Sequence, residues 1–180
     1  MQIQETTLSG ILIATPTVYE DPRGYFMESF VLPALEAFTG PITFVQENES
    51  KSRYGVTRGL HFQREPYAQS KLLRVVEGEI FDVAVDIRPQ SPTYGQYFSI
   101  HLSAENKKQL FIPKGFAHGF CTLSPCAILL YKTDNLYHPE SEGSFRYDSP
   151  DLHIAWPLPS QQMILSPKDT AAPCFSLTTR

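Results

Sequence analysis

Six short runs of apolar and β-branched residues follow one another through the middle of the chain, and Gly, Pro, Ser or Asn interrupts the sequence between them. A run of this length with turn residues at its ends predicts a β-strand, and several such runs at short, even spacing predict an all-β barrel or sandwich. The six expected strands cover residues 71–76, 79–88, 96–102, 108–112, 117–123 and 127–133.

One of these runs, residues 79–88, shows the alternation of a strand whose two faces differ. Its odd positions from 81 to 87 are Phe, Val, Val and Ile, whereas its even positions from 82 to 86 are Asp, Ala and Asp. A uniformly apolar face is typical of a strand that packs against a second layer. The mixed face is suited to line a pocket.

The flanking segments are expected to add strands and one short helix. Residues 8–19 and 25–30 are interpreted as strands joined by a turn at 20–24, where turn-forming residues cluster. A helix of two turns at most is expected at 32–38, because Pro33 suits a first turn and Gly40 and Pro41 cannot continue it. A strand at 43–48 and a loop to Tyr54 are expected next.

A single domain is expected over residues 1–180, which is enough chain to bury roughly two thirds of the unfolded surface. Its N-terminal strands would lie in about 1–50, the β-sheet core in about 51–135 and a wrapping segment in about 136–180. The tail at 157–180 is expected to contain one helical turn. No internal repeat or linker divides the chain.

The charge and cysteine content exclude several classes of protein. With 19 acidic and 15 basic residues, unclustered, the chain lacks the broad basic face that nucleic-acid binding requires. Cys121, Cys126 and Cys174 contain no CxxC pair, so a reducing cytoplasm fits better than an oxidising compartment. No apolar run approaches the ~20 residues that cross a bilayer, and residues 1–7 lack a leader pattern, so we expect neither a membrane span nor export.

In two stretches a histidine follows a glycine by a few residues. Gly55 precedes His61 after five residues, and Pro113, Gly115 and His118 form a Pro-x-Gly-x-x-His unit that opens a strand. Together they resemble the paired signature of the cupins, whose hairpins bring histidines to the mouth of a small barrel. The expected fold is therefore an all-β, cupin-like jelly-roll barrel with a few short peripheral helices.

The resemblance to metal-binding cupins stops at Gln63, where such a protein would usually carry a second histidine and then a carboxylate. A transition-metal site needs three or four imidazole or carboxylate donors. His61 and His118 alone do not supply them. We therefore expect no metal.

A closer resemblance covers nearly the whole chain. The stretch Arg-Gly-Leu-His-Phe-Gln at 58–63 and the stretch Ile-Pro-Lys-Gly-Phe-Ala-His-Gly-Phe at 112–120 resemble the dTDP-4-dehydrorhamnose 3,5-epimerase family. The same resemblance extends over residues 21–24, 71–72, 78–88, 102–107, 130–133, 150–152, 156–157 and 165–169.

The resemblance implies a cofactor-independent epimerase with four catalytic residues. Epimerisation beside a ketone needs a base, an acid across the sugar ring and a cation near the enolate oxygen. His61 would be the base, since an imidazole of unperturbed pKa about 6.5 accepts a proton near pH 7, and Asp169 would orient it. Tyr131 would be the acid and Lys71 the cation. The competing interpretations are a core histidine, a surface aspartate and a barrel-filling tyrosine.

The resemblance also implies a set of residues that bind a dTDP-4-keto-6-deoxy sugar. Arg23 and Lys168 would meet the diphosphate, and Arg58 the sugar. The alternative for every member of the set except His118 and Arg58 is a solvated side chain on the surface. Glu47 differs from the family, which usually has Asp at this position. The remaining members are Glu28, Gln46, Glu47, Asn48, His118, Tyr137 and Glu142.

The positions of Arg58 and His61 conflict with a regular strand. Strict alternation sends two residues three positions apart to opposite faces. Both can reach one pocket only if the backbone is irregular between them, and Gly59 is the expected site of a bulge.

Three other functions stay open beside double epimerisation. They are an epimerase of C3 or C5 alone, a cupin that binds a sugar nucleotide without turning it over, and a metal-dependent oxygenase. The resemblance further implies a homodimer in which N-terminal strands extend the partner's sheet, which would cover the apolar run at 8–19. The product would feed cell-surface polysaccharide.

Overall fold

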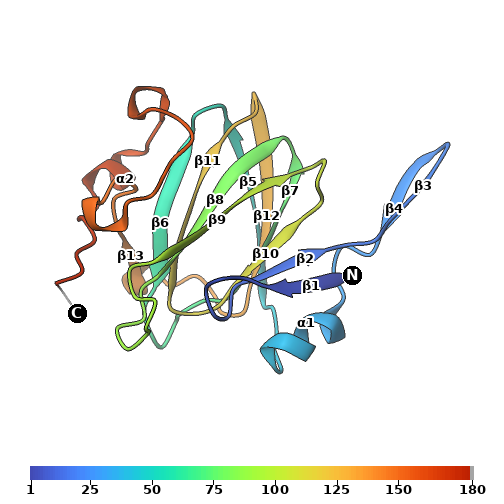
Figure 1. Cartoon of the computed structure of the whole chain (residues 1–180), viewed down its shortest axis with the longest axis horizontal. Helices are drawn as coiled ribbons and strands as arrows, with labels where there is room; N and C mark the ends of the chain where they lie inside the picture. The colour runs from blue at the N-terminus through green and yellow to red at the C-terminus, as the bar shows by residue number, and fades with distance from the viewer. Residues whose placement is uncertain (179–180) are drawn as a thin grey trace.

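The computed structural model describes residues 1–178 and is built around two antiparallel sheets (Figure 1). The prediction of an all-β fold is confirmed. The first sheet has the order β1 (Gln2–Glu5), β2 (Leu12–Thr15), β10 (Gln109–Ile112), β7 (Lys71–Glu77), β12 (Cys126–Thr133) and β5 (Gln46–Arg53). The second has the order β13 (Glu142–Ser144), β6 (Thr57–Gln63), β11 (Phe116–Thr122), β8 (Glu79–Asp86) and β9 (Tyr97–Ser103).

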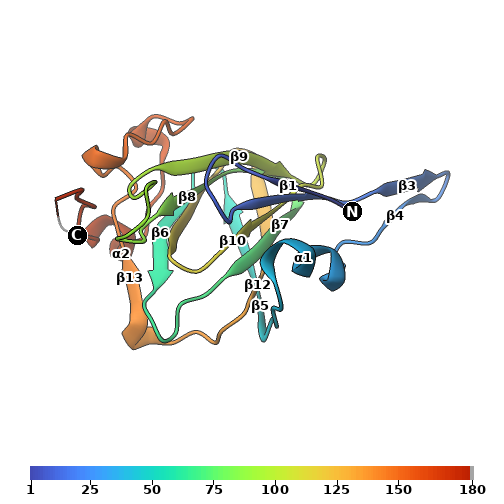
Figure 2. The same cartoon turned by 60° about the horizontal axis from the view of Figure 1, so that its bottom comes forward.

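The two sheets face each other and enclose the main core, as the turned view makes clear (Figure 2). All six strands predicted between residues 71 and 133 are present, within one or two residues of the expected bounds. The main cluster combines Leu73 and Leu110 of the first sheet with Ile80 and Leu102 of the second, all fully buried. Burying a side chain of this size stabilises the fold by about 1.5–3 kcal/mol.

Strand β8 confirms the predicted alternation and shows why both of its faces are buried. Ile80 and Ala84 point into the barrel, whereas Val83 and Val85 belong to a second cluster on the outer side of the sheet. Leu152 and Phe175 from the C-terminal segment contribute to that second cluster. The wrapping segment therefore protects an apolar sheet face that would otherwise meet solvent.

The helical parts are short and peripheral. Helix α1 (Leu32–Thr39) lies where the sequence predicts it and ends at Gly40, whose φ is +72°. The tail contains the predicted turn as helix α2 (Pro167–Ala171). Three 3₁₀ turns precede this helix in the chain, at Pro139–Ser141, Pro150–Leu152 and Ser160–Gln162. No helix within residues 1–178 is long and apolar enough to cross a membrane.

Strand β5 corrects the sequence prediction. A strand at 43–48 followed by a loop was expected, but the strand runs over Gln46–Arg53. It pairs with β12 along its whole length, from Gln46 opposite Thr133 to Arg53 opposite Cys126. Its sequence is almost entirely polar because it is an edge strand with one solvent-facing side, so hydrophobic periodicity could not identify it.

The N-terminal region also differs in detail. Residues 8–19 were expected to be one strand, but they contain β2 and the start of β3 (Val18–Asp21), while β1 was not predicted at all. Strand β4 (Gly24–Met27) pairs with β3 in a hairpin that projects from the body of the molecule (Figure 1). Tyr19 and Phe26 on this arm are more than half exposed.

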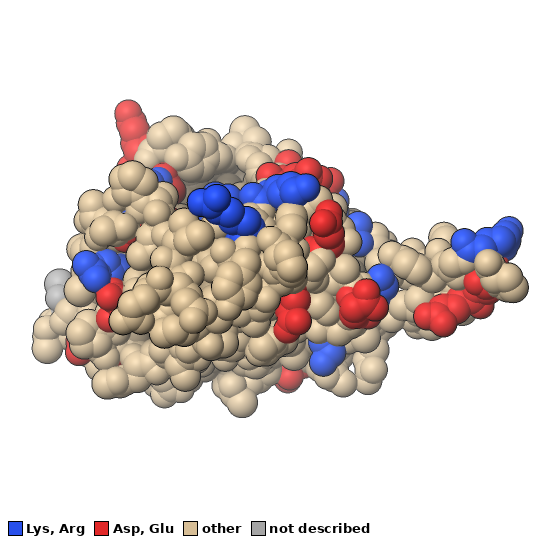
Figure 3. Space-filling view, turned by 90° about the horizontal axis from the view of Figure 1, so that it is seen from above, with Lys and Arg blue, Asp and Glu red and all other residues tan. Residues whose placement is uncertain are grey.

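On the face seen in Figure 3, charged side chains of both signs are interspersed among uncharged ones. The projecting arm carries both signs, since Asp21 and Arg23 lie at its tip. Asp21 accepts hydrogen bonds there from the backbone N–H and the guanidinium of Arg23. Near the other end of the arm, the buried Gln109 donates from Nε2 to the Ser29 carbonyl over 2.6 Å. The hairpin is thus anchored where it leaves the barrel and exposed where it turns.

Candidate active site

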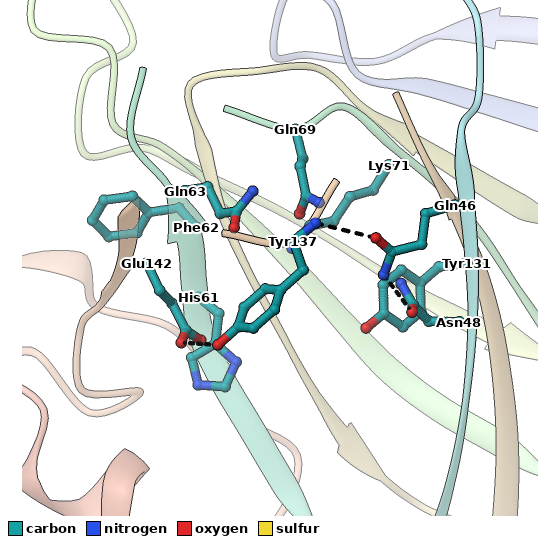
Figure 4. Close-up of a pocket in the computed structure, with 10 residues that line it drawn as sticks. All are labelled: Gln46, Asn48, His61, Phe62, Gln63, Gln69, Lys71, Tyr131, Tyr137 and Glu142. Atoms are coloured by element: carbon teal, nitrogen blue, oxygen red, sulfur yellow. Dashed lines mark hydrogen bonds between the residues drawn. The ribbon is translucent and has the colours of Figure 1, made fainter. Parts of the chain in front are cut away.

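A polar pocket of about 250 Å³ opens between the two sheets (Figure 4). Its walls come from β5, β6, β7 and β12, and Gln69, Tyr137 and Glu142 complete the lining. A polar pocket inside an otherwise apolar barrel is the arrangement expected of a binding or catalytic site. Its lining residues are Gln46, Asn48, His61, Phe62, Gln63, Gln69, Lys71, Tyr131, Tyr137 and Glu142.

His61 on β6 is paired with Asp169 on α2, although 108 positions separate them in the chain. His61 Nε2 and Asp169 Oδ1 are 2.5 Å apart, and since an ionised carboxylate can only accept, the imidazole donates from Nε2. This tautomer leaves Nδ1 with a free lone pair. Burial opposes ionisation of Asp169, but hydrogen bonds from His61, from Ser166 and from the Gly59 backbone outweigh it and hold the carboxyl pKa below its usual range.

The predicted bulge is present in β6. His61 lies opposite His118 of β11, yet Arg58 lies opposite Phe120, so one extra residue is inserted on β6 between them. Gly59 has φ +118°, and a Cβ there would lie only 2.5 Å from the Gly119 Cα. The irregularity brings Arg58 to the same side as His61, where its Nε donates to Ser52 Oγ of β5 over 3.1 Å.

Lys71 and Tyr131 face the pocket from neighbouring strands, as Figure 4 shows. Loss of hydration lowers the pKa of the half-buried Lys71 ammonium to about 8, and the negative charges of Asp82 and Glu142 offset only part of this effect. Burial raises the pKa of the Tyr131 hydroxyl, and the positive charge of Arg58 works in the opposite direction. At neutral pH the pocket thus holds an ammonium and a protonated phenol.

Glu142 and Tyr137 form a polar link across the front of the pocket (Figure 4). Tyr137 donates from its hydroxyl to Glu142 Oε2 over 2.9 Å and from its backbone N–H to Gln46 Oε1 over 3.1 Å. Lys168, next to Asp169 on α2, donates to the same Glu142 oxygen over 2.5 Å. Asn48 accepts from Gln46 Nε2 over 2.8 Å, which completes the chain of contacts.

Three lining residues were not among the predicted site residues: Phe62, Gln63 and Gln69. Gln63 uses its whole amide, donating to the carbonyls of Tyr67 and Leu136 and accepting from the His138 backbone N–H over 2.6 Å. It thereby joins the loop after β6 to the loop that carries Tyr137. A glutamine at the position where a cupin usually has a metal ligand was the signal that could have identified it.

Several predicted residues lie outside the pocket walls. Glu47 pairs with Lys132 over 2.6 Å on the opposite side of the first sheet, and His118 is buried against the fully buried Asp82 at 2.8 Å. Arg23 lies at the tip of the projecting hairpin and Glu28 follows it. Ligand contacts for these residues stay predictions. Among residues 1–178 no three His, Cys, Asp or Glu side chains are grouped as metal ligands would be.

A family model described as dTDP-4-dehydrorhamnose 3,5-epimerase matches residues 5–176. The chain belongs to this family. The epimerase of Salmonella typhimurium is 53% identical over 174 residues, which are 96% of this chain and 94% of that relative. The resemblance found in the sequence is therefore confirmed, and the enzyme class is that of a carbohydrate epimerase.

Solved structures of epimerases share the fold. A dTDP-6-deoxy-D-glucose-3,5-epimerase from Legionella pneumophila in complex with dTDP-4-keto-L-rhamnose superposes with a TM-score of 0.91 at 50% identity, covering 96% of this chain and 92% of that one. A 3'-monoepimerase from Streptomyces bikiniensis in complex with dTDP-quinovose gives 0.88 at 32% identity, covering 94% and 85%. The cupin-type jelly roll expected from the sequence is thus confirmed.

Proposed function

We propose that the chain performs the reaction for which its family is named. It inverts C3 and C5 of dTDP-4-dehydro-6-deoxy-D-glucose and so forms dTDP-4-dehydro-L-rhamnose. The observation that carries this proposal is the convergence of the His61–Asp169 pair, Lys71 and Tyr131 on one polar pocket. Proton removal and return leave the oxidation state of the sugar unchanged, so the proposed steps involve no redox cofactor.

His61 is the proposed base. With Nε2–H held by Asp169, Nδ1 takes the proton from the carbon beside the ketone, and the electron pair of the C–H bond moves into an enolate. The ionised Asp169 stabilises the imidazolium that results. The same base would serve C3 and C5 in turn, because both carbons flank the C4 ketone.

Lys71 is the proposed partner of the enolate oxygen. Its ammonium lies in the pocket without a fixed carboxylate partner among the described residues, so it can turn toward the substrate. In a site with few water molecules, a positive charge stabilises a developing oxyanion strongly. Arg58, close enough to lower the pKa of Tyr131, adds a second positive charge nearby.

Tyr131 is the proposed acid, returning a proton to the face of the sugar ring opposite His61. The two residues come from different sheets, Tyr131 from β12 and His61 from β6, and both line the pocket. A sugar ring between them would have one group on each face. A hydroxyl whose pKa is raised by burial stays protonated until the basic enolate carbon takes its proton.

Gln46, Asn48, Tyr137, Glu142 and Lys168 are proposed to hold the remainder of the sugar nucleotide. They form the connected set of polar contacts at the front of the pocket. Because each already has a partner, ligand binding would exchange these contacts rather than order loose side chains. Arg58 would extend the set on the Ser52 side.

A homodimer is proposed because Arg23 cannot serve its own pocket from the tip of an arm that projects from the barrel (Figure 1). The arm exposes Tyr19, Tyr25 and Phe26, which would be covered by a second copy. Mixing Arg23→Ala and His61→Ala subunits tests this directly. If the arm completes the neighbour's site, mixed dimers regain activity that neither parent has; no recovery in verified mixed dimers would contradict it.

The proposed reaction takes place in the cytoplasm, consistent with three unpaired cysteines. Its product has its ketone in place for reduction to dTDP-L-rhamnose, a precursor of cell-surface polysaccharide. Supplying a ketone reductase together with this chain tests the assignment. dTDP-L-rhamnose forms only if both centres are inverted.

An epimerase of one carbon is the second candidate, favoured by the similarity to the Streptomyces bikiniensis 3'-monoepimerase. The base and acid proposed here would suit either carbon. NMR of the product distinguishes the two. A product inverted at one centre, with solvent hydrogen at that carbon alone, would replace the double epimerase with the monoepimerase.

A further inference from the structure

Ser166 makes two contacts with Asp169 that use different parts of its hydroxyl group. Its oxygen accepts a hydrogen bond from the Asp169 backbone N–H over 3.1 Å, which caps the start of α2. Its hydrogen is donated to Asp169 Oδ2 over 2.7 Å. The first contact supports the helix, and the second acts on the carboxylate itself.

The donated hydrogen bond fixes which way the carboxylate faces. Asp169 Oδ2 is held by Ser166, so Oδ1 is directed at His61 Nε2, and the Gly59 backbone provides a further hydrogen bond. The Asp169 side chain is 4% exposed. A carboxylate rotated away from this orientation would leave the His61 Nε2–H without its partner.

We propose that Ser166 is a positioning residue for the His61–Asp169 pair. By donating to Oδ2 it holds Oδ1 against Nε2 and so keeps Nδ1, the nitrogen proposed to take the proton, free and correctly aimed. This inference rests on the proposed function, in which His61 is the base. It assigns Ser166 a role in the chemical step and none in contacting the sugar nucleotide.

The alternative is that Ser166 matters only as a helix cap. Substitutions can distinguish the two roles. A helix cap needs an oxygen that accepts from the backbone N–H, whereas positioning needs a hydroxyl that donates to the carboxylate. Ser166→Asp keeps the acceptor, loses the donor and places a negative charge beside Oδ2. Ser166→Gly removes the hydroxyl, yet glycine is tolerated at this helix position with little loss of stability. Ser166→Thr keeps both the donor and the acceptor.

Thr170 provides a matched control on the same helix. Its hydroxyl donates to the Ser166 carbonyl over 3.0 Å and not to the Asp169 carboxylate. Thr170→Val therefore removes a hydroxyl hydrogen bond of α2 without touching the pair. We expect kcat and KM of Thr170→Val and Ser166→Thr to stay within about twofold of the unmodified enzyme.

The experiment measures kcat, KM and thermal unfolding for these variants on dTDP-4-dehydro-6-deoxy-D-glucose, with His61→Ala alongside. Positioning predicts that kcat of Ser166→Asp and Ser166→Gly falls about tenfold or more while KM stays within about twofold and the folded state persists. Full kcat in a folded Ser166→Asp would overturn the proposal. If His61→Ala itself keeps full activity, the proposed function fails instead, and the two failures are distinguishable.

Discussion

Arg58 and His61 lie three positions apart on β6 and both reach the side of the strand that faces β5 and β12, because one extra residue at Gly59 shifts the register against β11. The backbone N–H of Gly59 also donates to the Asp169 carboxylate. A single irregularity in one strand thus positions His61, the proposed base, and Arg58, a cation proposed to bind the substrate. It also positions the Gly59 backbone, which hydrogen-bonds Asp169.

Gly59→Ala is expected to destabilise the fold by roughly 3 kcal/mol, because the new methyl group would overlap the backbone of β11 and alanine is strained at φ +118°. Thermal or denaturant unfolding measures the effect. Gly24→Ala is the matched control, since Gly24 also has positive φ but no atom within 4 Å of the added carbon, and should cost only about 1 kcal/mol. Equal losses would show that close packing at Gly59 is unimportant.

Activity should fall as the pH rises through about 8, where the Lys71 ammonium loses its proton. Because the pKa of Lys71 is lowered from its usual value, the charged form exists below pH 8 and is lost above it. The pH dependence of kcat measures this. Lys71→Arg stays charged and should lack the fall near pH 8.

Glu142→Gln provides a second test of whether Lys71 causes the fall in kcat at high pH. Glu142 raises the pKa of Lys71, so removing its negative charge should move the fall in kcat to lower pH. If the fall in kcat at high pH is unchanged in both Lys71→Arg and Glu142→Gln, a group other than Lys71 is responsible for it.

Tyr131→Phe is expected to separate proton removal from inversion. The phenyl ring retains the packing of the buried side chain but has no proton to return, so His61 can return only to the face from which it took the proton. Epimerisation should fall by about 100-fold or more, while exchange of substrate hydrogen with solvent persists. Product and exchange are both measured by proton NMR in D2O. Inversion at the normal rate would remove Tyr131 from the acid role.

The core strands could be predicted from the sequence because their apolar residues alternate or run continuously between turn residues. Strand β5 could not, since Glu47, Glu49 and Lys51 face solvent at a sheet edge and resemble a loop. Its position is decided by pairing with β12, which is a long-range interaction. Local composition therefore revealed the buried strands and missed the exposed strands β1 and β5.

The site was predictable to a different degree at each residue. The irregularity at Gly59 was predicted because the resemblance to the family assigns Arg58 and His61 to one site, whereas strict alternation would send them to opposite faces of the strand. The approach of Asp169 to His61 has no local signal, since it depends on how the C-terminal segment crosses the second sheet, and only resemblance to the family indicated it. Gln63 was missed because its hydrogen bonds go to backbone groups, two of which, at Leu136 and His138, lie in a segment far away in the sequence.

If His61 removes the protons at both C3 and C5, exchange of these protons with solvent depends on its imidazole. dTDP-4-dehydro-6-deoxy-D-glucose is incubated in D2O with the unmodified enzyme or with His61→Ala, and the C3 and C5 proton signals are followed by NMR. Both signals should be lost with the unmodified enzyme and retained with folded His61→Ala. Exchange at both carbons in His61→Ala at the normal rate would contradict the role of His61 as the base.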